Sequence, residues 1–317
     1  MAEKRNNSTP DHVDRELVIT RVLDAPRNLV FKAWTDAKRL TQWWGPHRFT
    51  SPICEADARP GGAIRINMCG PDGTIYPMTG VYQEIVEPER IVFASSALDG
   101  AGNWLFDILN TVTFEAQGGK TKLTLRAKVT KGSDKAFPYL AGMNEGWKQS
   151  LERLDGYSAI ATDEIADRMI FALRILDAPR ELVFKMWTDP QHIVHWWGPN
   201  GFTLTIDQMD VRPGGIWQFV MHGPNGVDYP NKIVYVEVVE PERLVYTHTG
   251  GVLFHSTVTF AEEGNQTRLT MLMLFDSAAE RDRIEKQFGA VEGLKQTLGR
   301  LEGQLAKTEE KVETKKS

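Results

Sequence analysis

Two pairs of carboxylates recur along the chain where they could act as general acids or bases. Glu84 and Glu237 form one pair, and Asp57 and Asp210 form the other. A carboxylate in an apolar cavity has a raised pKa and can exchange protons with a substrate. Asp and Glu are rarely buried without a partner, and each of these two aspartates is followed two residues later by an arginine. We therefore expect outward-facing or ion-paired carboxylates and assign no catalytic residue.

Histidines are concentrated in the second half of the chain and could suggest a metal site. They are His192, His195, His222, His248 and His255. The first two stand at i, i+3, a spacing that can hold a metal. The first half has Arg39 and Gln42 at the aligned positions, and no Cys, His or Glu completes a tetrahedral set. We expect no metal and no cofactor.

Two cysteines, Cys54 and Cys69, are the remaining reactive side chains. If a glycine pair at 61–62 forms the tip of a two-residue hairpin, the two thiols face each other and a disulfide is conceivable. A content of 2 cysteines in 317 residues fits a reducing compartment, however, and residues 1–15 have no apolar signal segment. We expect free thiols and a cytoplasmic location.

The carboxylate pairs recur because the sequence is a tandem repeat. The segment Trp-Trp-Gly-Pro at 43–46 returns at 196–199, an offset of 153 residues. From Arg21 to Val92, 40 of 72 aligned positions are identical. Such a period matches a whole domain rather than a solenoid unit. We predict domain 1 at residues 15–160, domain 2 at 167–306, and flexible termini at 1–14 and 307–317.

Hydrophobic patterning gives both copies the same order of elements: a strand, two short helices, about six strands and one long helix. Apolar residues recur at helical spacing over the last segment of each copy, around Leu151 and Leu298. We predict α+β architecture with two tandem helix-grip domains. In each, a curved antiparallel β-sheet wraps around a long C-terminal α-helix, and two short helices follow the first strand. The arrangement encloses space between helix and sheet.

The ordered motifs resemble those of the START-related helix-grip (SRPBCC) superfamily, and within it the family of activator-of-Hsp90-ATPase homologues. The motifs are Asp-Ala-Pro at 24–26, Phe-x-x-Trp-Thr-Asp ending at 36, Trp-Trp-Gly-Pro at 43–46, Arg-Pro-Gly-Gly at 59–62, Val-x-Pro-x-Arg ending at 90 and Gly-Trp at 146–147. The second copy repeats nearly all of them, with Leu294 in place of Trp147. The resemblance implies small-molecule binding in a deep apolar cavity. A chaperone partner is conceivable but unsupported, because the co-chaperone that names the family also uses a different, N-terminal domain.

Candidate cavity residues follow from strand alternation, from the long helices and from the tryptophan pairs. We expect one Trp of each pair in the core and the other packed against the sheet rim. The alternative, which is compatible with this, is that one Trp per copy lines the cavity mouth. The cavity-lining candidates are Trp43, Trp44, Ile64, Ile66, Met68, Met78, Met143 and Trp147 in the first copy, and Trp196, Trp197, Trp217, Phe219, Met221, Asn231, His248, His255 and Phe288 in the second. The two linings differ, which indicates either two different ligands or one domain that has become structural. The polar candidates of the second copy favour a more polar ligand there.

Charge and hydropathy narrow the class of partner. A net charge of −5 argues against a nucleic-acid binder, and the short apolar runs argue against a membrane span. We therefore predict a binding protein for a small apolar or amphipathic molecule. The alternatives are an enzyme of the cyclase or hydratase type that uses the same cavity, and a co-chaperone-like interaction protein.

Overall fold

The computed structural model describes residues 15–313 of the 317-residue chain. The chain forms two compact units, one ending at Ala161 and the other beginning at Thr162. Each unit is a seven-stranded antiparallel sheet with a long C-terminal helix, which confirms the predicted tandem α+β helix-grip architecture. The predicted flexible segment at 1–14 lies outside the described residues, as do residues 314–317.

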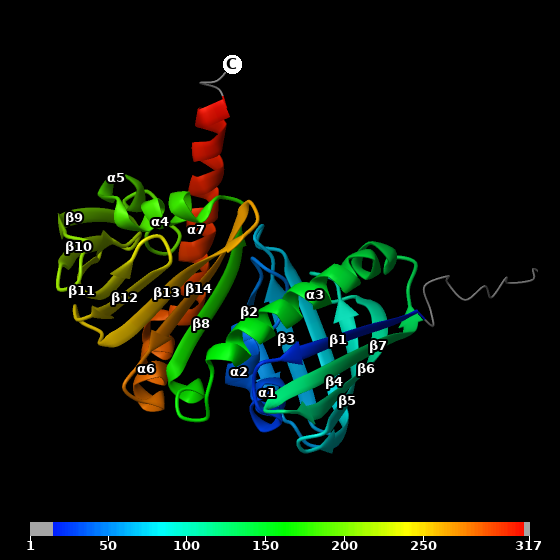
Figure 1. The fold of residues 1–317 in the computed structure, drawn as a ribbon. Helices are drawn as coiled ribbons and strands as arrows, with labels where there is room; N and C mark the ends of the chain where they lie inside the picture. Colours follow the sequence, from blue (N-terminus) through cyan, green and yellow to red (C-terminus); the bar gives the residue numbers. More distant parts are fainter. Residues whose placement is uncertain (1–14, 314–317) are drawn as a thin grey trace, which may run out of the picture. The chain divides into compact units, whose positions relative to one another are not determined.

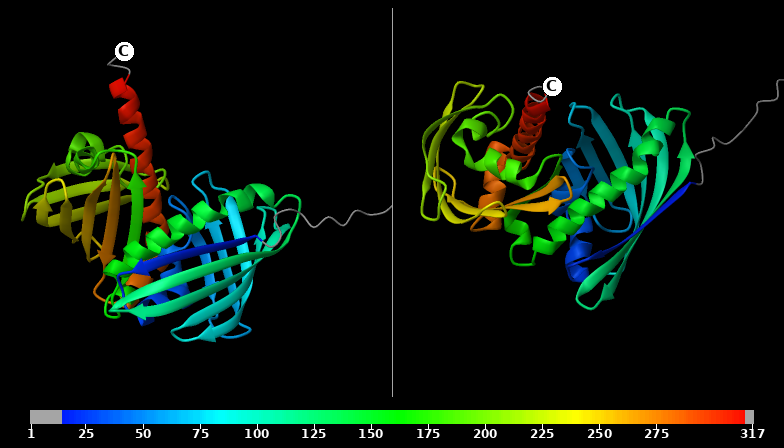
Figure 2. Two further views of the ribbon diagram at one scale, coloured as in Figure 1. Left: turned by 45° about the vertical axis from the view of Figure 1, so that its right-hand side comes forward. Right: turned by 45° about the horizontal axis from the view of Figure 1, so that its top comes forward.

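The first unit follows the predicted order of elements (Figure 1). They are β1 (Glu16–Leu23), α1 (Arg27–Thr35), α2 (Ala37–Trp43), β2 (Thr50–Ala56), β3 (Ala63–Cys69), β4 (Ile75–Val86), β5 (Arg90–Leu98), β6 (Trp104–Gln117), β7 (Lys120–Gly132) and α3 (Phe137–Ile160). The strand order is β1-β7-β6-β5-β4-β3-β2, so hairpins join all neighbours except β1 and β7. The views in Figures 1 and 2 show α3 lying across the curved sheet.

Period-2 alternation determines which side chains of the first sheet face α3. Along β7, for example, Leu123, Leu125, Ala127 and Val129 are all fully buried. On α3 the matching apolar face includes Leu151, which is also fully buried. Because the sheet is curved and α3 is straight, the two are in contact over part of their length and separated elsewhere.

The Arg-Pro-Gly-Gly turn between β2 and β3 needs both of its glycines. Gly61 adopts φ +82°, a conformation that side chains with a Cβ rarely take. A Cβ on Gly62 would lie 1.9 Å from the carbonyl oxygen of Asp57. The second unit repeats both constraints, because Gly214 has φ +80° and a Cβ on Gly215 would lie 2.1 Å from the Asp210 carbonyl oxygen. The motif therefore serves the turn.

The second unit repeats the sheet with the order β8-β14-β13-β12-β11-β10-β9. Its elements are a 3-10 turn η1 (Ala166–Arg168), β8 (Met169–Leu176), α4 (Arg180–Thr188), α5 (Pro190–Ile193), β9 (Thr203–Met209), β10 (Ile216–His222), β11 (Asp228–Val239), β12 (Arg243–His248), β13 (Phe254–Glu263), β14 (Gln266–Leu274), α6 (Ala278–Phe288) and α7 (Ala290–Glu313). Asp189 caps α5 by accepting a hydrogen bond from the Gln191 amide at 2.8 Å.

The C-terminal helix of the second unit differs from the prediction in two respects. A single helix was expected, but Gly289 adopts a left-handed conformation with φ +59° and separates α6 from α7. Ser277 caps α6 as its capping-box sequence predicts, accepting from the Glu280 amide at 3.1 Å. The helix also extends to Glu313, beyond the predicted domain end at 306, so residues 307–313 are helical rather than an unstructured tail.

Candidate functional site

A cavity of about 650 Å³ lies in the first unit between α3 and the sheet. Its wall is mostly aromatic, aliphatic and proline side chains from β3 to β6, from α3 and from the loop after α2. The lining residues are Trp44, Pro46, Phe49, Met68, Thr74, Tyr76, Pro77, Met78, Ser95, Ala97, Leu98, Phe106, Ile108, Asn110, Pro138, Tyr139, Gly142, Met143, Gly146, Trp147 and Ser150. None of them carries a formal charge, so the cavity offers apolar surface and a few neutral polar groups.

Two of the polar lining groups, Ser95 of β5 and Asn110 of β6, lie together and are more than nine-tenths buried. The amide nitrogen of Asn110 donates to the Ser95 hydroxyl oxygen at 3.0 Å and to the Phe93 carbonyl oxygen at 3.5 Å. Since a carbonyl oxygen can only accept, this contact fixes which end of the amide faces the strand. A single neutral polar point therefore stands on an otherwise apolar stretch of the sheet.

Aromatic residues line the cavity on the side of α3 and on the side of the sheet. Trp147 of α3 packs edge to face against Trp44, with ring centroids 5.2 Å apart. Tyr76 of β4 and Tyr139 of α3 approach each other at 6.3 Å. Tyr139 is 37% exposed, so this pair lies where the cavity meets solvent. A Cβ added to the nearby Gly142 would meet nothing within 4 Å, which leaves the helix side of the cavity open.

A buried arginine holds the loop that carries Pro46 and Phe49. The guanidinium of Arg153, on α3, donates to the carbonyl oxygens of Gly45 at 2.9 Å and of Pro46 at 3.1 Å, and more weakly to those of Gln42, Trp44 and Phe49. Arg153 is 1% exposed. The planar, multidentate donor suits a cluster of acceptors in a turn. The contact fixes one wall of the cavity to α3.

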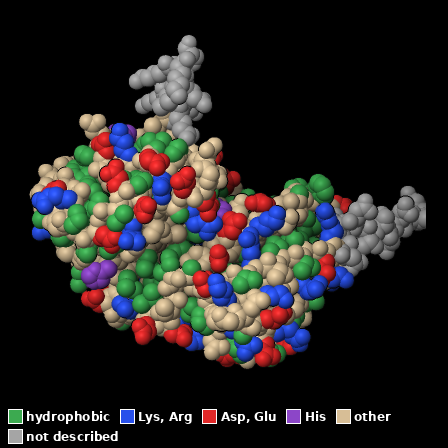
Figure 3. All heavy atoms as spheres, viewed as in Figure 1, with side chains coloured by type: hydrophobic (Ala, Val, Ile, Leu, Met, Phe, Trp, Pro, Cys, Tyr) green, Lys and Arg blue, Asp and Glu red, His purple; other side chains and the backbone are tan. Residues whose placement is uncertain are grey.

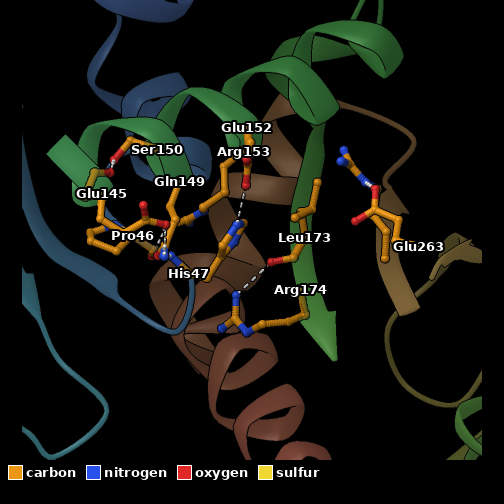
Figure 4. A network of polar contacts seen from close by, with 12 residues as sticks. Pro46, His47, Glu145, Gln149, Ser150, Glu152, Arg153, Leu173, Arg174 and Glu263 are labelled. Atoms are coloured by element: carbon orange, nitrogen blue, oxygen red, sulfur yellow. Dashed lines mark hydrogen bonds and ion pairs between the residues drawn. The ribbon is translucent and has the colours of Figure 1, made fainter. Parts of the chain in front are cut away.

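A glutamine and an acidic residue complete this attachment. The backbone amide of His47 donates to the side-chain oxygen of Gln149 at 3.1 Å. The His47 ring nitrogen Nε2 lies 2.9 Å from the Glu152 carboxylate (Figure 4). Figure 4 also shows that these partners project from successive turns of α3 toward the loop.

The same attachment recurs in the second unit, and our sequence interpretation missed it. Arg300 donates to the carbonyl oxygens of Gly198 and Pro199, both at 2.9 Å, and Gln296 accepts from the Asn200 amide at 3.2 Å. The signal was present in the sequence: Gln-Ser-Leu-Glu-Arg-Leu at 149–154 matches Gln-Thr-Leu-Gly-Arg-Leu at 296–301. Apolar spacing locates the long helices but does not single out the polar residues that both copies share.

Bulky aromatic residues of the second unit replace two core isoleucines of the first. Trp217 and Phe219 of β10 align with Ile64 and Ile66 of β3, and their rings stack with centroids 4.2 Å apart. They are 2% and 1% exposed. Trp197 packs edge to face on Trp217 at 5.0 Å. This region of the second sheet is therefore part of the hydrophobic core.

The polar cavity candidates of the second unit contact other residues of the protein. The two ring nitrogens of His248 lie 2.6 Å from the Val252 carbonyl oxygen and 2.8 Å from the side-chain oxygen of Asn231, and the ring stacks on Phe254. Burial lowers the pKa of His248, although the hydrogen bond to Val252 opposes this. His255, by contrast, is exposed and contacts Thr247.

The predicted site residues therefore fall into distinct groups. Trp44, Met68, Met78, Met143 and Trp147 line the first cavity. Deep core positions are taken by Trp43, Ile64, Ile66, Trp196, Trp217 and Phe219. Partly buried positions are taken by Trp197, Met221 and Asn231. Placing His255 and Phe288 in a cavity was wrong, because His255 points out from the sheet and Phe288, at the end of α6, is 49% exposed.

The first Trp of each pair has a structural role. The indole of Trp43 donates to the Ala33 carbonyl oxygen at 2.9 Å, and that of Trp196 donates to the Met186 carbonyl oxygen at 3.0 Å. Both tryptophans are fully buried. These bonds tie each second short helix to the first.

The carboxylates are outward-facing and ion-paired. Arg90 Nε donates to Glu84 at 3.0 Å, and the equivalent Arg243 bond to Glu237 is 3.2 Å. Asp57 and Asp210 each lie 2.9 Å from the arginine two residues later. No group of three or more His, Cys, Asp or Glu side chains within residues 15–308 could hold a metal ion.

The conceivable pairing of the two cysteines does not occur. Cys54 lies opposite Ile66, because the turn between β2 and β3 closes with the Asp57 amide donating to the Ala63 carbonyl oxygen and is longer than a two-residue hairpin. Cys69 lies opposite Thr50, beyond an irregularity between Thr50 and Ile53. Both thiols are free.

The comparisons with known proteins agree with this fold. The sequence profile of the family described as "Activator of Hsp90 ATPase homolog 1-like protein" matches residues 24–159 and 177–306. The chain belongs to this family. Its two repeats are two consecutive family domains, and no curated protein matches the chain.

Several solved structures are similar to this family member. One is an uncharacterised protein from Rhizobium leguminosarum (30% identical, 44% of this chain and 91% of that chain covered, TM-score 0.40). Another is a protein from Chromobacterium violaceum (27% identical, 46% and 98% covered, TM-score 0.40). A third is a protein from Silicibacter pomeroyi, which is 23% identical (45% and 96% covered, TM-score 0.40).

Two surface properties bear on partners. No helix in the described part of the chain is both long and apolar enough to cross a membrane. On the face seen in Figure 3, acidic and basic side chains are intermixed rather than gathered into a basic area. That face lacks the extended positive patch that a nucleic-acid backbone requires.

Proposed function

We propose that the first domain binds one small, uncharged, largely apolar molecule in the cavity between α3 and the sheet. The observation that supports this is the chemistry of the wall: a cavity of about 650 Å³ whose lining includes six aromatic side chains and no charged one. The volume lies within the range of roughly 300–1,000 Å³ typical of small-molecule sites. An apolar ligand would release water from both surfaces on entering.

A charged ligand fits the cavity poorly. Moving an ion from water into an apolar site is costly unless an opposite charge or several hydrogen bonds meet it. Besides the tyrosine hydroxyls and the indole N–H groups of Trp44 and Trp147, the lining provides four neutral side-chain polar groups, and two of these, Thr74 and Ser150, already donate within the protein. Neutral molecules are therefore preferred over carboxylates, phosphates and amines.

The chemistry of the cavity wall also favours binding over catalysis. It contains no carboxylate and no imidazole that could transfer a proton to a bound molecule. The carboxylates that recur in both copies, Glu84 and Glu237, pair with arginines and do not line the cavity.

We assign the second domain a structural role. Trp217 and Phe219 fill its core where the first domain has isoleucines, and the side-chain oxygen of Asn231 lies 2.8 Å from a ring nitrogen of His248. Of the two alternatives that the sequence left open, we therefore favour one ligand-binding and one structural domain over two domains that bind different ligands.

A matched pair of dyes tests the proposal. N-phenyl-1-naphthylamine is neutral, and 8-anilinonaphthalene-1-sulfonate is the same skeleton with a permanent charge. We expect the full-length chain to bind the neutral dye at one site and at least about tenfold more tightly than the sulfonate. Equal affinity for the two dyes, or no binding of the neutral dye, would contradict the proposal.

A further inference from the structure

We propose that Ser95 and Asn110 recognise a hydroxyl group on the ligand, so that the first domain selects apolar alcohols or phenols over hydrocarbons. This inference rests on the proposed function and specifies its ligand class. It starts from a place in the cavity wall where two buried polar side chains retain both an unused donor and an unused acceptor.

The β5–β6 register brings the two side chains together. Ser95 lies opposite Ile108, and Asn110 lies opposite Phe93. Ser95 and Asn110 are therefore diagonal neighbours on the same face of the sheet, which is the face that lines the cavity. Ser95 is 7% exposed and Asn110 is 2% exposed. Buried polar groups at such positions normally have all their partners.

Among the residues that the structure describes, the hydrogen bonds of Ser95 and Asn110 leave one donor and one acceptor without a partner. The Ser95 oxygen accepts from the Asn110 amide nitrogen, so the hydroxyl proton of Ser95 must point elsewhere. Within the described residues, neither that proton nor the side-chain oxygen of Asn110 has a partner. A donor and an acceptor therefore lie side by side at the wall of an apolar cavity.

A hydroxyl group on the ligand can accept a hydrogen bond from one member of this pair and donate one to the other. Its oxygen accepts the Ser95 proton while its own proton goes to the Asn110 oxygen. An ether can only accept and so satisfies one of the two groups, and a hydrocarbon satisfies neither. Leaving buried polar groups unpaired is penalised, so the pair discriminates against these analogues.

The second domain lacks this arrangement. His248 replaces Ser95 and bonds to Asn231, while Ser256 replaces Asn110 and donates to the Leu272 carbonyl oxygen at 3.1 Å. The unused donor and acceptor are thus specific to the domain that has the cavity described above.

Three biphenyls that differ only in the 4-substituent test the inference by calorimetry on the full-length chain: 4-phenylphenol, 4-methoxybiphenyl and 4-methylbiphenyl. We expect the phenol to bind about tenfold more tightly than the methyl compound, with the methoxy compound between them. In Ser95→Ala the phenol should lose this advantage and bind within about twofold of the methyl compound. Asn110→Leu, which keeps a similar volume, should have the same effect.

Ser150→Ala is the matched control. Ser150 lines the same cavity, but its hydroxyl donates to the Gly146 carbonyl oxygen at 2.7 Å within α3. The preference for the phenol should therefore be unchanged in this variant. Loss of the preference in Ser150→Ala, or its persistence in Ser95→Ala, would overturn the assignment.

The neutral dye separates this inference from the proposed function. If the wild-type chain binds the dye but does not distinguish the three biphenyls, the cavity is a binding site and the hydroxyl recognition is wrong. If neither the dye nor any biphenyl binds, both proposals fail. Dye binding by Ser95→Ala also verifies that the variant retains a folded cavity.

Discussion

The indole of Trp197 lies edge to face against that of Trp217, with ring centroids 5.0 Å apart. In the first domain the aligned Trp44 instead meets Trp147, from the helix, at 5.2 Å. The second copy has Leu294 in place of Trp147 and a tryptophan in place of Ile64. The aromatic partner has thus moved from the helix to the sheet, where its ring stacks on Phe219 and fills the core.

Replacing Trp217 with Ile should destabilise the second domain by about 2–4 kcal/mol, because the change removes a buried aromatic ring and leaves a cavity. Unit-specific stability can be measured by hydrogen exchange of peptides from each domain. Trp104→Ile is the control: this residue is 42% exposed, and its loss should cost little. Unchanged exchange in Trp217→Ile would show that the ring does not support the core.

Arg153→Lys should destabilise the first domain by about 2 kcal/mol, since a lysine cannot bridge the carbonyl oxygens that the guanidinium joins. It should also weaken dye binding, because the detached loop carries Pro46 and Phe49 of the cavity wall.

Arg300→Lys removes the equivalent contact from the second domain. It should destabilise that domain while leaving dye affinity unchanged. A fluorescence titration with the neutral dye measures the binding of both arginine variants. If both variants bound the dye more weakly than the wild type, or if neither did, the predicted difference between the two domains would be wrong.

Acid should destabilise the second domain through His248. Burial lowers the pKa of His248 in the folded chain, so the unfolded chain takes up the proton first as the pH falls. The contribution to stability is therefore complete above the unfolded pKa of roughly 6.5 and is lost progressively below it. Between pH 7.5 and pH 5.5, hydrogen exchange should report weakening of the second domain.

His248→Gln should reduce that pH dependence, because the amide cannot take up the proton. His255→Gln should leave it unchanged, since His255 is exposed on the sheet. An identical acid response in the two variants would assign the effect to other groups.

The sequence predicted the domain architecture well because both copies carry the same signals. Turn glycines such as Gly61, caps such as Ser277 and strand alternation all act locally, so periodicity and motif spacing detect them. The break at Gly289 was missed because apolar residues continue at helical spacing on both sides of it.

The site was predicted less completely. Side chains from the helix, such as Met143 and Trp147, were identified by their spacing, and they line the cavity. Asn110 was missed because its position depends on the late-strand register, which alternation alone does not fix. Ile64 and Ile66 face inward as alternation indicates, but the sequence does not show that other side chains cover them.

The central claim, that the first domain binds its ligand in the cavity between α3 and the sheet, is tested most directly by comparing Gly142→Leu with Gly299→Leu in the full-length chain. Each glycine lies in a helix where a Cβ would meet nothing within 4 Å, but only Gly142 lines the cavity. Both changes should stabilise their own domain by about 0.5–1 kcal/mol through helix propensity. In a titration with N-phenyl-1-naphthylamine, Gly142→Leu should weaken binding at least about fivefold, because its side chain would occupy the cavity, and Gly299→Leu should bind like the wild type. Equal affinities in the two variants would contradict the claim.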